Sequence, residues 1–349
     1  MLKVGIIGAG TIAGRHLESF LQNKDAKVVA IADLNEELAK NRAEQYGIEE
    51  CYNDYKKILE DKTIEAVLIT TPTFTHHDIV LDALRAGKHV MCEKPPCLTP
   101  KQAEECVAEA EKCGKLLMWA FVCRFVPQYK FIKDYIASGR LGEAYHAEVV
   151  SVGRCSMMNG WFLDKNLAGG HLLDVAIHRI DEIMYLMDYP KVKYVVGYST
   201  DVNKELPSKI KGLGSSYTSR DAKKYERTVE SAASGYVKLD NGVSLFVKAG
   251  SVMYSVKNGA HIELIGDKSG VYYEYGKTPE ISTSMDNYMY EMKPEITDKG
   301  NAFEEEVNHF VDCVLNGTEC IVKPWQAVEV LKIIDGIYRS GETGELVIY

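Results

Sequence analysis

Short apolar runs alternate with amphipathic segments up to about residue 120. The runs that suit buried strands cover residues 3–8, 28–33, 66–70 and 89–93. The helical segments follow Thr11, cover 36–46 and 77–86, and follow Thr99. Thr99 stands directly before Pro100, a pair typical of a helix N-cap with proline in the first turn. Strands and helices that alternate in this way predict a parallel sheet with right-handed crossovers.

The pattern changes after Gly142, where longer runs with strand character begin. They cover residues 144–152, 192–199, 231–239, 243–249 and 261–265, and Asn241-Gly242 is typical of a hairpin turn. Helices are expected over 169–187, 302–315 and 325–339. The fold class is therefore α/β. We expect one domain over 1–121 and a second α/β domain with a mostly antiparallel sheet over 122–349, with the final helices able to pack back on the first.

The composition is that of a globular protein without a polyanionic partner. The 349 residues carry a formal net charge of −9 and no basic stripe, which argues against nucleic acid or a membrane surface. The nine cysteines are odd in number and form no CxxC pair, so we expect no disulfide framework or zinc knuckle and a cytoplasmic location. The polar stretch 206–227 is expected to be a long loop, either a lid or a solvated excursion, and the latter is favoured.

A glycine-rich turn directly follows the first predicted strand. Gly8 suits a tight turn, Gly10 allows backbone N–H groups to approach a pyrophosphate, and the small Ala13 allows close packing of helix on strand. The helix that begins near Thr11 would direct its N-terminus at the phosphates. Asp33 ends the second strand, where its carboxylate would accept hydrogen bonds from ribose hydroxyls and repel a 2′-phosphate. No arginine follows it closely in the sequence, so the segment predicts a dinucleotide site that prefers NAD to NADP.

Polar residues also follow the next two predicted strands. Thr71-Pro72 lead to His76 after one strand, and Glu93-Lys94 end the other. Ligands of open α/β sheets bind at the carboxyl ends of the strands, which is where these residues lie. An exposed ion pair of little energetic value is the alternative for a lone lysine, and the position of Lys94 favours a functional role.

The predicted helix over 169–187 carries a polar pair on an otherwise apolar surface. Asp174 and His178 are four residues apart and share one helix face, with His171 one turn earlier. We expect a buried helix whose polar pair faces a cleft, and a purely structural Asp/His pair is the alternative. A metal site at these three residues is not expected, because no HExxH motif or neighbouring cysteine supports it.

Taken in order along the chain, these motifs resemble those of the Gfo/Idh/MocA family, named for glucose–fructose oxidoreductase, inositol dehydrogenase and rhizopine catabolism. Further landmarks are Gly87-Lys88-His89-Val90, Arg124-Phe125 with Pro127, Trp161 and Gly169-Gly170. The resemblance covers essentially the whole chain. It implies a Rossmann domain that binds NAD or NADP, followed by an α/β domain whose open sheet mediates a homodimer or homotetramer.

The resemblance also implies roles for individual residues. Lys94, Asp174 and His178 would be catalytic, and they would bind the substrate together with Arg124 and Trp161. The residues implied to line the cofactor are Gly8, Gly10, Thr11, Ile12, Ala13, Asp33, Leu34, Thr71, Pro72, His76, Glu93, Lys94, Arg124 and Trp161.

These residue types suit the oxidation of a secondary alcohol, with a sugar, cyclitol or glycoside as the expected substrate. His178 would accept the hydroxyl proton, and Lys94 would stabilise the charge that develops on oxygen as hydride passes to the nicotinamide. Asp174 would orient the histidine or hold a neighbouring hydroxyl. Two positions depart from the family pattern, because His171 replaces a frequently small residue and Ala176 a usual glycine. Pocket shape and the placement of the catalytic histidine are the properties that these departures affect.

Two alternatives stay open. A redox-neutral glycosidase or lyase would oxidise the sugar transiently, eliminate at the adjacent carbon and keep its NAD. A non-catalytic sensor would bind NAD without turnover, and the complete set of Lys94, Asp174 and His178 argues against it. Net NADH production on substrate separates the dehydrogenase from both.

Overall fold

The structure is a computed structural model, and it describes residues 1–153, 160–202 and 226–349. The loop expected over 206–227 lies outside the described residues except for Glu226 and Arg227. Among the described helices, none has both the length and the apolar character needed to cross a membrane.

The chain forms two compact units, and each of them is discontinuous. The first unit comprises Met1–Phe125 and Gly300–Val328, and the second comprises Val126–Lys299 and Glu329–Tyr349. Segment 300–328 joins the first unit, where its helix packs on the first helix of the chain, and the residues after Val328 belong to the second unit.

A six-stranded parallel sheet forms the centre of the first unit, in the order β3-β2-β1-β4-β5-β6. Its strands are β1 (Leu2–Ile7), β2 (Ala26–Ala32), β3 (Glu50–Tyr52), β4 (Ala66–Ile69), β5 (His89–Glu93) and β6 (Leu117–Ala120). The predicted parallel sheet is confirmed. The sequence missed β3 and β6, which are three and four residues long and carry too few positions for a periodic pattern.

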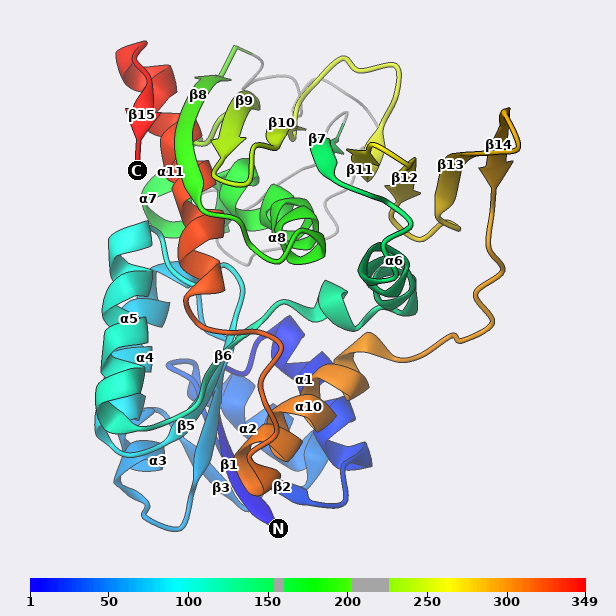
Figure 1. The fold of residues 1–349 in the computed structure, drawn as a ribbon. Helices are drawn as coiled ribbons and strands as arrows, with labels where there is room; N and C mark the ends of the chain where they lie inside the picture. Colours follow the sequence, from blue (N-terminus) through cyan, green and yellow to red (C-terminus); the bar gives the residue numbers. More distant parts are fainter. Residues whose placement is uncertain (154–159, 203–225) are drawn as a thin grey trace. The chain divides into compact units, whose positions relative to one another are not determined.

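Helices cover both faces of this sheet. They are α1 (Thr11–Gln22), α2 (Glu36–Tyr46), α3 (Lys56–Glu60), α4 (His76–Arg85), α5 (Pro100–Cys113) and α10 (Ala302–Asn316), with 3-10 turns η1 (Thr73–Thr75) and η2 (Val122–Phe125). In Figure 1, α4 and α5 lie on one face of the sheet and α1 and α10 on the other. All four residues of β4 are buried as a result, which is typical of a parallel strand covered on both sides.

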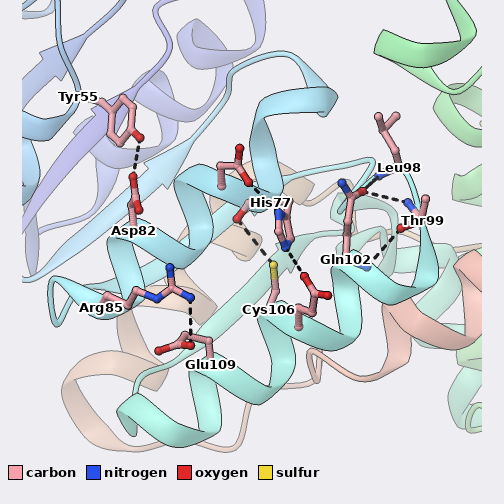
Figure 2. Close-up of polar contacts among 11 residues, drawn as sticks. Tyr55, His77, Asp82, Arg85, Leu98, Thr99, Gln102, Cys106 and Glu109 are labelled. Atoms are coloured by element: carbon pink, nitrogen blue, oxygen red, sulfur yellow. Dashed lines mark hydrogen bonds and ion pairs between the residues drawn. The ribbon is translucent and has the colours of Figure 1, made fainter.

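Polar contacts tie α4 to its neighbours, as Figure 2 shows. The Nε2 atom of His77 on α4 lies 2.8 Å from a carboxylate oxygen of Glu105 on α5. The Tyr55 hydroxyl donates to Asp82 at 2.7 Å. Thr99 caps α5 as predicted, because its hydroxyl accepts from the Gln102 N–H while the Gln102 side chain accepts from the Thr99 N–H. Side-chain hydrogen bonds therefore hold α4 to its neighbours in addition to apolar packing.

The second unit contains a nine-stranded sheet in the order β14-β13-β12-β11-β7-β10-β9-β8-β15. Its strands are β7 (Ala144–Val152), β8 (Val192–Thr200), β9 (Ala232–Leu239), β10 (Ser244–Gly250), β11 (Gly259–Gly266), β12 (Ser269–Glu274), β13 (Glu280–Met285), β14 (Tyr288–Met292) and β15 (Val347–Ile348). The sheet is antiparallel except where β7 and β10 pair in parallel, which confirms the mostly antiparallel expectation.

The second unit also contains helices (Figure 1). They are α6 (Pro127–Ala137), α7 (Lys165–Ala168), α8 (Ile177–Leu186) and α11 (Gln326–Thr343), with the 3-10 turn η3 (Gly160–Leu163) and the π-helix η4 (Leu172–Ala176). α11 approaches β8 so closely that a Cβ on Gly197 would lie 2.6 Å from the Ile337 Cα atom. Next to Gly197 along β8, Val196 points to the opposite face and is 45% exposed.

Candidate active site

The glycine-rich turn adopts the conformation that its sequence predicts. Gly8 has φ +103°, and a Cβ there would lie 2.8 Å from the carbonyl carbon of Thr70, so both the backbone angle and the space require glycine. A Cβ built on Gly10 meets no described atom within 4 Å, which leaves open space beside the N-terminus of α1. No side chain of the described residues caps that N-terminus, so its amide groups are available to an anion.

Asp33 is fastened to this turn by its own carboxylate. One oxygen accepts from the Ala9 N–H and the other from the Asn35 N–H, both at 2.8 Å. Each carboxylate oxygen can accept more than one hydrogen bond, so capacity remains for ribose hydroxyls. Arg42 reaches the same turn, because its Nε donates to the Ala9 carbonyl at 3.2 Å. The sequence did not indicate this arginine, since it lies on α2 and not directly after Asp33.

His76 links the loop after β4 to the loop after β5. Its Nε2 atom lies 2.8 Å from the Thr71 carbonyl oxygen and its Nδ1 atom 2.8 Å from the Pro95 carbonyl oxygen. The ring is almost completely buried, and burial lowers the pKa of His76. These contacts hold the backbone of Thr71-Pro72 against the segment that follows Lys94, so the two loops keep a fixed spacing.

Glu93 precedes Lys94 and is bound on both carboxylate oxygens. His16 Nε2 lies 2.7 Å from Oε1, and the backbone N–H of Lys94 donates to Oε2 at 2.9 Å.

Glu306 on α10 is fully buried, and neither of its carboxyl oxygens has a hydrogen-bond partner among the described residues. Burial, with the Glu93 charge second, raises the pKa of Glu306 well above its usual value. Both effects favour the neutral form of the Glu306 carboxyl.

Arg124 is 2% exposed and anchored within the first unit. One guanidinium nitrogen, Nη1, donates to the Ile321 carbonyl at 3.0 Å and to the Gln326 side chain at 2.6 Å. The guanidinium carbon lies 5.1 Å from the centre of the Phe121 ring. Arg124 thus ties η2 to the segment that returns after α10, an anchor that its position in the sequence did not indicate.

In the second unit, paired glycines separate α7 from the helix that the sequence predicts over 169–187. α7 ends at Ala168, and Gly169 and Gly170 have φ +76° and +92°. A Cβ on Gly170 would lie 2.1 Å from a carboxylate oxygen of Glu230, so glycine is required there. That carboxylate accepts from the Leu172 N–H at 2.7 Å, and burial raises the pKa of Glu230. The two left-handed glycines therefore end α7, and the expected helix begins just after them as the π-helix η4 followed by α8.

Asp174 and His178 lie where the π-helix η4 passes into α8. Between His171 and Met184, every residue is buried except Asp174, Val175 and His178. The helix is buried, as expected, and the polar pair belongs to its one accessible patch. π-helical turns are rare and occur frequently at functional sites.

Two other residues that the sequence analysis singled out, Trp161 and His171, make different contacts in the second unit. The Trp161 ring on η3 stacks on Phe162, with ring centres 3.9 Å apart. His171 is buried, and its Nε2 atom lies 3.3 Å from the Ser151 carbonyl oxygen. Trp161 remains partly accessible, as does Phe162, and an accessible indole suits a surface for a sugar ring.

The predicted site residues fall into two sets, one in each unit. Contacts in the first unit join the glycine-rich turn to Asp33 and the Thr71 loop to the loop after Lys94. Thr11, Ile12 and Ala13 form the first turn of α1, and Leu34 beside Asp33 is 94% exposed. The second set comprises Trp161, Asp174 and His178.

Comparison with known proteins identifies the family. The model of an oxidoreductase family with an NAD-binding Rossmann fold matches residues 2–121, and the model of the C-terminal alpha/beta domain of that oxidoreductase family matches 133–348. The chain belongs to the Gfo/Idh/MocA family. Its first unit is an NAD-binding Rossmann domain, and the protein is an oxidoreductase. Both domains of a Gfo/Idh/MocA protein are present, in the order that the motifs predicted.

Characterised Gfo/Idh/MocA relatives include dehydrogenases of sugars and cyclitols. The chain is 30% identical over 350 residues to D-glucoside 3-dehydrogenase of Escherichia coli K12, covering 98% of this chain and 96% of that protein. It is also 30% identical over 186 residues to myo-inositol 2-dehydrogenase of Thermotoga maritima, covering 53% of this chain and 55% of that protein.

Solved Gfo/Idh/MocA structures share the fold at low identity. An oxidoreductase domain protein from Kribbella flavida superposes with a TM-score of 0.86 at 20% identity, covering 99% of this chain and 98% of that one. Levoglucosan dehydrogenase in complex with NADH gives a TM-score of 0.81 at 20% identity, with the same coverage. At this identity the likeness describes the fold alone.

Proposed function

We propose that the protein is an NAD-dependent dehydrogenase that oxidises a secondary hydroxyl of a sugar, cyclitol or glycoside. The observation that carries the proposal is the accessible patch of the segment from His171 to Met184, which contains Asp174 and His178 on an otherwise buried element. A burial pattern that leaves an acid and a histidine accessible together suits proton transfer. In an NAD-binding oxidoreductase, the alcohol that gives up a hydride must also lose a proton.

His178 is proposed as the base that accepts the hydroxyl proton, because a neutral imidazole does this near neutral pH. Asp174 orients that imidazole or accepts a hydrogen bond from a neighbouring hydroxyl. Lys94 contributes a positive charge toward the oxygen, with its backbone fixed by Glu93. NAD⁺ supplies the hydride acceptor when bound.

The first unit offers a fitting set of groups for the dinucleotide. The open space at Gly10 and the uncapped N-terminus of α1 suit a pyrophosphate, and the remaining acceptor capacity of Asp33 suits ribose hydroxyls. Arg124 and His76 are buried and bonded to backbone carbonyls, so we assign them the positioning of the cofactor loops. We assign Trp161 to contact with the substrate.

The substrate class follows from similarity to enzymes of known reaction. D-glucoside 3-dehydrogenase matches nearly the whole length of this chain, so a sugar or glycoside is the first candidate. The match to myo-inositol 2-dehydrogenase makes cyclitols the second. Both are ring polyols whose oxidised group is a secondary alcohol.

The test is NADH formation by the purified protein with a panel of aldoses, glucosides and inositols. We expect stoichiometric NADH with at least one of them and loss of turnover in His178→Ala, with His77→Ala as a control histidine on α4. Product formation without net NADH would instead support the redox-neutral glycosidase or lyase. NAD binding without turnover on the whole panel would favour the sensor.

We further propose that two or four copies associate through the second sheet. Residues of the uncovered face stand opposite one another across three strands, because Phe246 pairs with Tyr236 and Tyr236 pairs with Val196. All three are at least partly exposed, and a continuous apolar and aromatic stripe of this kind suits a second copy. Sedimentation at micromolar concentration should give the mass of a dimer or tetramer, and a monomer mass contradicts the proposal.

A further inference from the structure

Three nitrogen and sulfur ligands converge at the end of α10 in the first unit. His309 and Cys313 are one helical turn apart on α10, and Gly317 ends the helix in a left-handed conformation. The chain then returns, so that Cys320 approaches the other two side chains. The Nε2 atom of His309 and both sulfur atoms all lie within 4.8 Å of one another.

The spacing of these atoms matches that around a tetrahedral metal. Cys313 Sγ lies 3.4 Å from His309 Nε2. With Zn–S bonds of about 2.3 Å and Zn–N bonds of about 2.0 Å, tetrahedral geometry separates a sulfur from a nitrogen ligand by about 3.5 Å. The same geometry separates two sulfur ligands by about 3.8 Å. The side chains therefore need only small adjustments to share one ion.

The cluster is also chemically prepared for a cation. Cysteine binds a metal ion as the thiolate, and two thiolates offset the charge of a divalent cation. The imidazole of His309 completes a set of three ligands that a borderline-soft cation prefers.

His309 already presents the correct form of its ring. Its Nε2 atom accepts from the backbone N–H of Ile321 at 3.0 Å, so the lone pair of this nitrogen points toward the returning segment and the proton lies on Nδ1. A metal at Nε2 replaces this hydrogen bond, and the exposed position of the contact allows water to take the Ile321 N–H.

We propose that His309, Cys313 and Cys320 form a binding site for one soft divalent cation, with Zn²⁺ as the expected ion. Two sulfur ligands and one imidazole select Zn²⁺ over Mg²⁺ or Ca²⁺, and water fills the fourth position. No zinc knuckle was expected from the sequence, because the nine cysteines form no CxxC pair. The site is independent of the proposed dehydrogenase reaction.

The position of the site gives the cation a structural role. Ile321, directly after the ligand Cys320, accepts a hydrogen bond from Arg124 at 3.0 Å. A cation that joins α10 to Cys320 therefore fixes the short segment that anchors Arg124. We expect bound Zn²⁺ to stabilise the first unit and to leave the chemistry of the second unit unchanged.

Titration of the full-length reduced protein with Co²⁺ tests the site, because thiolate ligands give Co²⁺ an intense charge-transfer band. We expect one equivalent to bind with this band and Zn²⁺ to displace it. Cys320→Ala should weaken binding at least about 100-fold, since loss of a ligand costs no less than loss of an outer-shell partner. Cys51→Ala is the matched control, because Cys51 is also partly exposed and lies on β3 outside the cluster. No band, or an equal band in Cys320→Ala, overturns the proposal.

A second measurement needs no substitution. Zn²⁺ should protect Cys313 and Cys320 of the unmodified, reduced protein from alkylation, as read by peptide mass spectrometry. Cys51 in the same sample should react equally with and without Zn²⁺. Equal alkylation of Cys320 in both samples shows that the three side chains form only a hydrogen-bonded cluster, and this result also overturns the proposal.

Discussion

The two sheets of the chain meet solvent in opposite ways. In the first unit, helices cover both faces, and β4 has no accessible residue. In the second unit, buried and accessible residues alternate along β10, and all of β14 is exposed. A sheet covered on both sides has only its strand ends left for ligands, whereas a sheet with an open face has a surface left for association.

The same contrast extends to the predicted site residues. Those of the first unit follow the carboxyl ends of strands and are fixed by backbone contacts, such as the two carbonyls bound by His76. In the second unit, Asp174 and His178 lie on a helix rather than at a strand end. The first unit is thus suited to hold a cofactor, and the second to supply Asp174 and His178 for proton transfer.

The division of labour predicts that binding and turnover separate by unit. His178→Ala should lower kcat by about 10²–10⁴-fold, the usual contribution of a positioned proton-transfer group. The dissociation constant for NAD⁺ should change little, because this residue belongs to the second unit. Steady-state kinetics and calorimetric NAD⁺ titration of the same preparation measure both. Near-normal turnover would assign the base elsewhere, with Lys94 acting directly as the next candidate.

Matched truncations test the difference between the sheets. Leu68→Ala in β4 removes a fully buried side chain and should cost about 2–5 kcal/mol of unfolding free energy. Val196→Ala on the open face of β8 should cost less than about 0.5 kcal/mol in a monomer. Denaturant unfolding at several protein concentrations measures both variants. A cost at Val196 that grows with concentration would show that copies cover this face, and equal costs at low concentration would refute the contrast.

Cofactor preference should depend on the turn of the first unit. Asp33→Ser removes the carboxylate that would repel a 2′-phosphate and leaves Arg42 at the same turn. We expect the ratio of kcat/KM for NADP to that for NAD to rise at least about tenfold, equivalent to about 1.4 kcal/mol. Asp25→Ser, an exposed acid before β2, is the control. Equal kinetics of the wild type with both cofactors would contradict the preference.

The last prediction concerns the pH dependence of stability. The folded-state pKa of Glu306 is raised, so the folded state holds a proton that the unfolded state loses above its ordinary pKa. Stability therefore falls as pH rises from the unfolded pKa toward the folded one, by at most about 1.4 kcal/mol per pH unit for this group. Glu306→Gln should remove that slope, whereas Glu305→Gln at an exposed position should keep it. Unfolding free energies between pH 4 and 8 provide the comparison, and identical slopes for all three proteins would exclude the effect.

The features that could be predicted from the sequence are those that depend on residues close together in the chain. Gly8 and Thr99 act through neighbours in the chain, so the turn and the helix cap could be predicted. The contact between Arg124 and Ile321 joins residues 197 positions apart, and no local pattern indicates it. The helix break before Leu172 depends in the same way on Glu230, which is distant in sequence and closes over Gly170.

The discontinuity of both units has a consequence for biosynthesis. α10 packs on α1, and Asn308 accepts a hydrogen bond from Asn23 at 2.8 Å. A ribosome releases α1 long before α10. The side of α1 that contacts α10 therefore stays uncovered in the nascent first unit while most of the second unit is synthesised. Neither unit can be produced by cutting the chain once. Completion of the NAD-binding unit is therefore coupled to translation of nearly the entire protein.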